Sequence, residues 1–414
     1  MPPTLPTQPP THFVSLLLHM SAAILLTQDT VAQYVTEKAS QIGVFPPDAS
    51  LSAICIQGGN VNFAFSVRSD CGKSVFVKQA PEYVAIFGPD GLPLTSTRIQ
   101  KEVAVMKEWT TILGGEADVY LPKLYYFDDE NKVFVMEFLE DFVLLDHHLL
   151  GTLAPTTELA IAIQLGGFMA RTHLATNSSK ISTERAAFLS TEYENRALRD
   201  IQLEYVFTKA YSEESTQTST KFKVDEKFSA EIDALKARYN GEVGSGNFSL
   251  CHGDLHPGSV MIKVGGTSTQ VRVIDPEFTV FGPPGLDVGS LFSGYILAAV
   301  HQSYAQTDSA SKVECVSSIS KGVAAAWECY SSIMRQGGVT DEIIREIEVE
   351  TVGFAVAEVC RTALGFAGGR LWLQFDDTNV HNLAVETALS IVKKCMTARH
   401  DGGIQVLFDC LNAL

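Results

Sequence analysis

The chain has 414 residues, of which 46% are hydrophobic and 19% charged, so it can bury a large core and is not expected to be disordered. Its 48 acidic and 31 basic residues give a formal net charge of −17. Most of such a surface would repel a phosphate backbone, so nucleic acid is not an expected partner.

Residues 1–26 are predicted to be a non-essential extension. The apolar run from Phe13 to Leu26 has no preceding lysine or arginine and no clear small-residue cleavage site, so it does not fit a secretory leader. It is also too short to cross a bilayer, and no other stretch has the apolar length of a transmembrane helix, so no membrane partner is expected. The eight cysteines contain no CxxC pair and are interpreted as reduced thiols of a cytoplasmic protein.

Residues 27–139 have the pattern of a small α+β lobe. Apolar residues at helical spacing predict a first helix over 27–42. Short runs rich in β-formers then predict three strands, a helix and a further strand, at 51–56, 63–68, 74–78, 95–109 and 133–139. The lobe is therefore expected to be built on a small sheet.

Residues 140–414 are predicted to form a second, larger and mostly helical lobe. Helical periodicity and start signals cover 156–175, 192–210, 228–239, 286–306, 312–335, 340–366 and 382–397. The boundary between the lobes is placed near residue 140.

Two short segments carry the strongest functional signal, HGDLHPGS at 252–259 and VIDPEF at 273–278. Each follows an apolar strand, and a glycine-containing hairpin joins them, so they can face one another across a cleft. Phosphoryl transfer needs a carboxylate that orients the acceptor hydroxyl and takes its proton, and Asp254 fits that role. Asp275 and Glu277 are two residues apart, so on an extended segment they would point to the same side and could hold Mg²⁺ through oxygen ligands.

Together these segments resemble the catalytic and metal loops of the protein-kinase and aminoglycoside-phosphotransferase superfamily. The chain has Ser259 and AspProGlu where protein kinases have asparagine and AspPheGly. With GPPGLDVGS at 282–290, these replacements are similar to the methylthioribose kinases in particular, and the resemblance covers roughly residues 27–365. It implies an α+β, two-lobed protein-kinase-like fold, with a small β-rich N-lobe, a larger mostly helical C-lobe, and ATP and Mg²⁺ between them.

The resemblance also implies roles for individual residues. Nucleotide would be bound by a phosphate-covering turn, a strand lysine with its glutamate partner, and a hinge that reads adenine. These residues are Gly59, Asn60, Asn62, Lys78, Glu102, Glu137, Phe138 and Leu139. The implied metal ligands are Asp275, Glu277 and Ser259, and the implied scaffold residues are His252 and Asp287.

The activity implied by the resemblance is transfer of the γ-phosphate of ATP to the 1-hydroxyl of 5-methylthioribose, in methionine salvage. Asp254 would orient that hydroxyl, and Arg361 would steady the charge on the transferring group. The family pattern has two adjacent arginines and a tryptophan where this chain has Cys360 before Arg361, and Leu92. Arg370 is a candidate to restore the missing positive charge. Family members tend to pair, so a homodimer is possible.

Two alternatives follow from the same residues. One is a kinase of another small-molecule hydroxyl, such as an aminoglycoside, choline or a homoserine-like alcohol, because family resemblance does not fix the acceptor. The other is a non-catalytic pseudokinase that keeps the fold. The joint presence of Lys78, Asp254, Asp275 and Glu277 argues against that second alternative.

Overall fold

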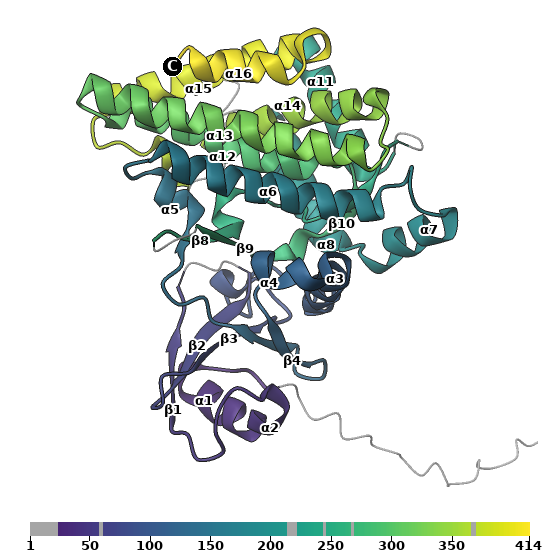
Figure 1. Cartoon of the computed structure of the whole chain (residues 1–414), viewed down its shortest axis with the longest axis vertical. Helices are drawn as coiled ribbons and strands as arrows, with labels where there is room; N and C mark the ends of the chain where they lie inside the picture. The colour runs from purple at the N-terminus through teal and green to yellow at the C-terminus, as the bar shows by residue number, and fades with distance from the viewer. Residues whose placement is uncertain (1–23, 58–60, 213–221, 243–245, 266–268, 366–369) are drawn as a thin grey trace, which may run out of the picture.

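A computed structural model describes residues 24–57, 61–212, 222–242, 246–265, 269–365 and 370–414. Figure 1 shows two lobes, a small one built around a β-sheet and a larger one made mostly of helices. The predicted fold class, α+β with a small β-rich lobe and a larger helical lobe, is therefore confirmed.

The N-lobe is an antiparallel five-stranded sheet with one helix on its outer face. The strands lie in the order β1-β2-β3-β5-β4. Their bounds are β1 Leu51–Cys55, β2 Phe63–Ser69, β3 Ser74–Gln79, β4 Leu124–Asp128 and β5 Val133–Glu137. Helix α1, Gln28–Glu37, places Val31, Tyr34 and Val35 on the sheet, and α2, Ala39–Ile42, continues it after a break at Lys38. The helix predicted over 27–42 is thus two shorter helices.

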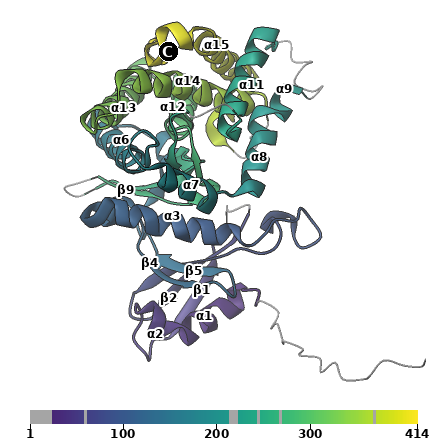
Figure 2. The same ribbon diagram turned by 90° about the vertical axis from the view of Figure 1, so that its right-hand side faces the viewer.

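Helix α3, Arg98–Leu113, lies between the sheet and the larger lobe (Figure 2). One of its faces packs Ile99, Val103 and Met106 against the sheet. Another face contributes Trp109 to the core of the C-lobe. Residues at the start of α3 are therefore held in fixed positions with respect to both lobes.

The C-lobe is a helical assembly around α12, which is apolar on all sides and almost wholly buried. Its helices are α4 Ala117–Tyr120, α5 Leu145–Leu149, α6 Pro155–Thr176, α7 Thr183–Glu192, α8 Arg196–Phe207, α9 Lys209–Ser212, α11 Glu226–Asn240, α12 Gly285–Ala305, α13 Ser309–Gln336, α14 Asp341–Ala363, α15 Thr378–Gly402 and α16 Ile404–Asn412. Short 3₁₀ helices are η1 Ala85–Phe87, η2 Gly114–Glu116, η3 Pro257–Ser259, η4 Pro276–Phe278 and η5 Leu371–Leu373. Within the described ranges no helix is long and apolar enough to cross a membrane.

Two small sheets stand where the lobes meet. Their strands are β6 Val143–Leu144, β7 Ser249–Cys251, β8 Val260–Lys263, β9 Gln270–Val273 and β10 Val280–Gly282. Strand β8 pairs with β6 and β9, and β7 pairs with β10, all antiparallel. These pairings determine the positions of the predicted catalytic and metal loops.

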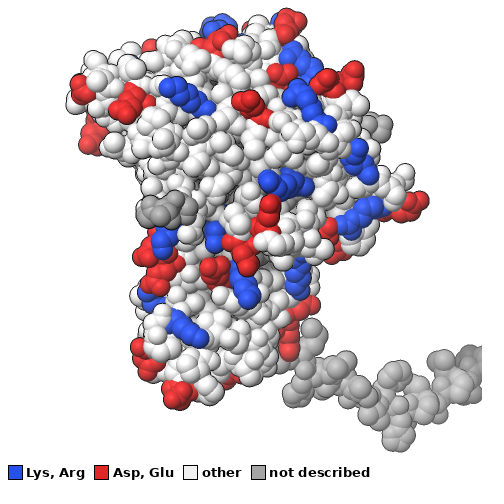
Figure 3. All heavy atoms as spheres, in the orientation of Figure 1, with Lys and Arg blue, Asp and Glu red and all other residues white. Residues whose placement is uncertain are grey.

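The helix predicted over 192–210 is interrupted at both ends. The structure ends α7 at Glu192, begins α8 at Arg196 and breaks again at Thr208. The first break places Asn195 outside the helical backbone region, and its side chain donates a hydrogen bond to the carbonyl of Glu277 at 2.8 Å. The interruption thus lets this segment contact the predicted metal loop. On the face drawn in Figure 3, acidic and basic side chains are interspersed among larger uncharged areas.

Candidate active site

Paired strands bring the predicted catalytic and metal loops together. The first loop runs from β7 to β8 and the second from β9 to β10, so the β7–β10 and β8–β9 pairings place the loops side by side. Gly253 marks the closest approach. Its φ is 86°, and a Cβ atom at this position would lie 1.9 Å from the carbonyl oxygen of Phe278. Only glycine fits there without displacing the metal loop.

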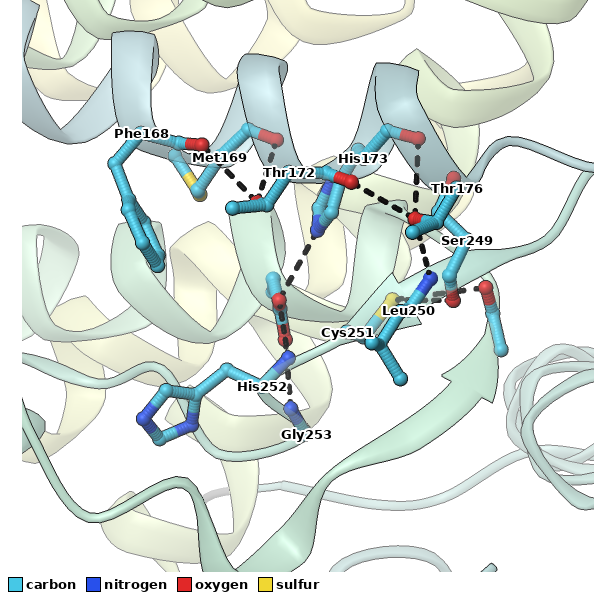
Figure 4. A network of polar contacts seen from close by, with 12 residues as sticks. Phe168, Met169, Thr172, His173, Thr176, Ser249, Leu250, Cys251, His252 and Gly253 are labelled. Carbon is cyan, nitrogen blue, oxygen red and sulfur yellow. Dashed lines mark hydrogen bonds and ion pairs between the residues drawn. The ribbon is translucent and has the colours of Figure 1, made fainter. Parts of the chain in front are cut away.

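Asp287, in the first turn of α12, holds the catalytic loop through two hydrogen bonds. Its Oδ2 accepts the backbone N–H of His252 at 2.7 Å, and its Oδ1 accepts that of Gly253 at 2.9 Å. His173 of α6 points toward the same turn in Figure 4, with its Nε2 3.1 Å from Asp287 Oδ2. Burial opposes ionisation, but these partners hold the pKa of the Asp287 carboxyl below its usual value. The geometry suits a scaffold role.

His252 connects the two loops through both nitrogens of its ring. Nε2 lies 2.9 Å from the carbonyl oxygen of Ile274, and Nδ1 lies 3.3 Å from the backbone N–H of Asp254, so the bonds assign the Nε2–H tautomer. The ring also stacks on Trp109 of α3, with centroids 6.0 Å apart. With both nitrogens engaged, His252 is placed as a scaffold residue rather than a base.

Asp254 presents its carboxylate at the surface of the catalytic loop, with 22% of the side chain exposed. Burial, and then the negative charge of Glu358, raise its pKa to about 6. His256 Nε2 lies 3.7 Å from Asp254 Oδ2, but burial lowers the pKa of that histidine to about 3, so the imidazole is neutral at neutral pH. Because its own pKa of about 6 lies below neutral pH, Asp254 is ionised there and can accept a proton from a hydroxyl.

Ser259 is placed beneath Asp254. Its hydroxyl donates a hydrogen bond to the carbonyl oxygen of Asp254 at 2.9 Å, and the residue is 5% exposed. The hydroxyl therefore braces the catalytic loop. Its second role, as a metal ligand through the oxygen lone pair, stays a prediction.

Lys78 of β3 lies at the centre of a cluster of charges, in which Lys78, Glu102 and Glu277 are buried and Asp275 is exposed. Its Nζ is 2.9 Å from Glu102 Oε1 and 3.9 Å from Glu277 Oε2, and it also contacts Asp275 Oδ1. Burial is the main cause that raises the pKa of Glu102 to about 8 and that of Glu277 to about 7. A cation bound among the three carboxylates would favour their ionised forms and so lower these pKa values.

The geometry expected for the metal loop is wrong in one respect. Asp275 and Glu277 do not lie on an extended segment, because Asp275 has a left-handed backbone (φ 63°, ψ 48°) and Pro276–Phe278 form a 3₁₀ turn. The carboxylate oxygens of Asp275, Glu277 and Glu102 nevertheless lie within 4.8 Å of one another. Such an all-oxygen set fits Mg²⁺. A left-handed non-glycine residue costs about 1 kcal/mol and is typical of functional turns.

Arg98, the first residue of α3, is a site residue that the sequence does not reveal. Its side chain is 1% exposed, and its Nε donates to Asn62 Oδ1 at 3.0 Å. Asn62 Nδ2 in turn donates to Glu277 Oε2 at 2.6 Å. The guanidinium also donates to the carbonyls of Val61, Pro81, Tyr83, Leu94 and Thr95. A possible signal was a basic residue in the first turn of a helix, where the dipole disfavours it.

A cleft of about 580 Å³ between the lobes has the size of a cofactor site. Its apolar lining includes Ile56, Ala64, Phe76, Met136, Leu139 and Met261, and its polar end includes Lys78, Glu102, Asp275 and Glu277. In the predicted hinge, the backbone N–H of Glu137 donates to the carbonyl of Lys123 at 2.8 Å, so that amide is not available to a ligand. Phe138 lies under the guanidinium of Arg68, 5.0 Å from ring centroid to Cζ. Gly59 and Asn60 lie outside the described residues.

A second, much smaller space adjoins Asp254 on the C-lobe side. It is lined by Gln202, Gly253, Asp254, Ser290, Phe354, Glu358 and neighbouring apolar residues. Its volume is only about 10 Å³, so the side chains around it must move apart before an acceptor can enter.

Arg361 and Arg370 both pair with Glu358, which lines this second space. Both guanidinium groups contact Oε2 of Glu358, Arg361 Nη2 at 2.8 Å and Arg370 Nη2 at 3.2 Å. Cys360 is fully buried, and burial raises the pKa of its thiol to about 12, so this side chain belongs to the core. Leu92 is 46% exposed. The structure therefore supplies a second cation beside Arg361, from a position nine residues further along the chain.

Comparison with known proteins gives one consistent picture. Residues 69–310 match the phosphotransferase enzyme family. A methylthioribose kinase of a Geobacillus species is 25% identical over 369 residues, covering 83% of this chain and 86% of that protein. A methylthioribose kinase of Escherichia coli is 30% identical over 283 residues, covering 66% and 64%. Among solved structures, a Plasmodium vivax ethanolamine kinase is 13% identical, covers 90% of each chain and has a TM-score of 0.45.

Proposed function

The chain belongs to the phosphotransferase enzyme family, and we propose that it is a methylthioribose kinase, which transfers the γ-phosphate of ATP to the 1-hydroxyl of 5-methylthioribose. The names of its relatives support the choice of acceptor. The observation that carries the chemistry is the position of the catalytic loop. Asp254 lines the small C-lobe space, while the metal loop next to it lines the large cleft. An acceptor and a nucleotide could therefore meet at one carboxylate.

The proposed reaction assigns a role to each of the following groups. The ionised Asp254 carboxylate orients the acceptor hydroxyl and takes its proton as the oxygen attacks the γ-phosphorus, and the bond from the γ-phosphorus to the β–γ bridging oxygen breaks to release ADP. Lys78 contacts the nucleotide phosphates, and Arg361 lies on the acceptor side to steady charge on the transferring group. Asp275 and Glu277 would hold Mg²⁺, with Ser259 as a possible third ligand. When bound, that ion neutralises charge on the polyphosphate.

The charges around the small space favour a neutral acceptor. Asp254 and Glu358 line the space, and Arg361 and Arg370 pair with Glu358 beside it, so the formal charges of these four residues sum to zero. A site for choline or an aminoglycoside would be expected to carry a negative excess that attracts the cation. A neutral polyhydroxylated acceptor has no such requirement.

The test is ATP turnover with Mg²⁺ on four acceptors: methylthioribose, ribose, choline and an aminoglycoside. Asp254→Asn is the blank, because it keeps the side-chain shape but removes the base. We expect turnover on methylthioribose, lower by roughly 10²–10⁴-fold in the variant. Turnover on a different acceptor alone would support the proposed phosphoryl transfer but contradict methylthioribose as the substrate. No turnover on any acceptor, with ATP still bound, would indicate a pseudokinase.

Two further parts of the proposal concern the setting of the enzyme. A cytoplasmic location is supported by its eight free cysteines, since reduced thiols are usual in that compartment. A homodimer is the proposed assembly. Sedimentation of the purified chain at micromolar concentration checks it, and a mass of one 45.0 kDa chain would contradict it.

A further inference from the structure

Glu358 of α14 is an unusual residue for its position. It is 8% exposed, and glutamate is rarely buried in proteins unless it is paired or functional. It lines the small space that Asp254 also lines, yet neither its sequence context nor the phosphoryl-transfer chemistry described above assigns it a role. A buried carboxylate in the wall of an acceptor site is a candidate to contact the acceptor.

Among the described residues, the two arginines that contact Glu358 leave its Oε1 without a hydrogen bond. Arg361 contacts Oε2 through both Nε and Nη2, each at 2.8 Å, and Arg370 contacts the same oxygen at 3.2 Å. Burial opposes ionisation, but the two guanidinium groups hold the pKa of Glu358 below its usual value. Glu358 is thus an oriented anion, and Oε1 is the oxygen able to accept a hydrogen bond from a molecule in the space.

Apart from Glu358 and Ser290, whose hydroxyl has no hydrogen-bond partner among the described residues, the polar side chains of this wall are already committed. Gln202 Nε2 donates to the carbonyl of Gly253 at 2.9 Å, and its Oε1 accepts the hydroxyl of Tyr239. Asp254 is assigned to the reacting hydroxyl. Glu358 is therefore the charged wall residue that remains to recognise a second hydroxyl of the acceptor.

We propose that Glu358 is a specificity-determining residue, which accepts a hydrogen bond from the acceptor hydroxyl adjacent to the one that is phosphorylated. Arg361 and Arg370 act as positioning residues for this carboxylate. The inference rests on the proposed function and deepens it, because it restricts the acceptor to a vicinal diol. For methylthioribose the contacted group is the 2-hydroxyl.

The test compares two acceptors on three proteins. Methylthioribose and its 2-deoxy analogue are assayed with the wild-type chain, with Glu358→Ala and with Glu348→Ala. Glu348 is a matched control, since it also lies on α14 and pairs with an arginine three residues away, Arg345, at 2.7 Å. Glu358→Gln, which keeps the size of the side chain, is added in case the alanine variant folds poorly.

Wild type and Glu348→Ala should prefer methylthioribose by about 10- to 100-fold in kcat/KM, as expected for a hydrogen bond to a charged group. Glu358→Ala should use both acceptors equally, because deleting either partner removes the same bond. The KM for ATP should not change. If Glu358→Ala or Glu358→Gln loses activity equally on both acceptors and keeps the wild-type preference, the inference is overturned. If wild type does not phosphorylate methylthioribose, the proposed function fails instead.

Discussion

The nucleotide side and the acceptor side of this site are built in different ways. Lys78, Asp275 and Glu277 lie on or next to short strands whose hydrogen-bonded pairing fixes their positions. The acceptor wall joins Glu358 and Arg361 of α14 to Arg370, which precedes η5. Strand pairing positions the residues of the nucleotide side, whereas the side chains of one helix and of the segment that follows it form the acceptor wall.

The same difference appears in the free space of each side. The cleft of about 580 Å³ is already large enough for a nucleotide, while the acceptor space of about 10 Å³ is closed around its side chains. Binding on the acceptor side must therefore include rearrangement, which makes its geometry easier to alter by substitution.

The largest expected effect comes from the place where the catalytic and metal loops touch. In Gly253→Ala the new Cβ would lie 1.9 Å from the carbonyl oxygen of Phe278, at a φ of 86°, so the loops must separate. We expect loss of at least about 10²-fold in kcat, since reacting groups would be misplaced. The measurement is steady-state kinetics together with the melting temperature.

Gly241→Ala is the control for this substitution. Gly241 also has a positive φ, of 75°, but nothing lies within 4 Å of its Cβ position. It should lose about 1 kcal/mol of stability from backbone strain and keep its turnover. Equal activity losses in both variants would mean that the strained backbone, and not the contact with Phe278, limits the enzyme.

The sequence predicts the nucleotide side of this site better than it predicts the acceptor side. The sequence identified Lys78, Asp254, Asp275 and Glu277 as a set, and the structure brings all four to the junction of the lobes, because their motifs sit at the ends of strands. It did not identify Glu358 or Arg98. Both are charged residues on helices, and tertiary packing buries them, to 8% and 1% exposure.

The prediction of an extended backbone for the metal loop was wrong for a related reason. Alternation along an extended strand predicts that residues two apart share a face, but Asp275 adopts a left-handed conformation, which the sequence pattern does not encode. The break before α8 was missed because Asn195 is held by a bond to the distant carbonyl of Glu277. In both cases a long-range contact determines a local conformation.

The second expected effect concerns Arg98, which couples α3 to the nucleotide side. Replacement by methionine would remove the donors to Asn62 Oδ1 and to several buried carbonyls. We expect a loss of about 3 kcal/mol in the free energy of unfolding, and a raised KM for ATP because Asn62 loses its anchor. Denaturant unfolding and nucleotide titration measure the two effects.

Arg98→Lys gives a sharper form of this test. A lysine has one ammonium group and cannot reproduce the planar set of donors, so it should recover little of the stability. Full recovery by lysine would show that the charge alone matters. An unchanged KM for ATP in the methionine variant would show that Arg98 does not affect nucleotide binding.

The smallest expected effect is a change in the pH dependence of the acceptor side. Burial and then Glu358 raise the pKa of Asp254 to about 6, whereas Arg370 and Arg361 lower it. Because the base must be ionised, kcat/KM should rise with pH, reach half its maximum near pH 6, and level off above it. Arg370→Gln removes a positive charge that lowers the pKa of Asp254, so the midpoint should move to higher pH, and activity at pH 6 should fall more than activity at pH 8.

Arg335→Gln is the control for this substitution. The exposed Arg335 is paired with Asp341 far from this wall, so its replacement should leave the midpoint unchanged. A midpoint that stays fixed in Arg370→Gln, or moves to lower pH, would mean that Arg370 does not act on Asp254 and that the acceptor wall is electrostatically independent of the base.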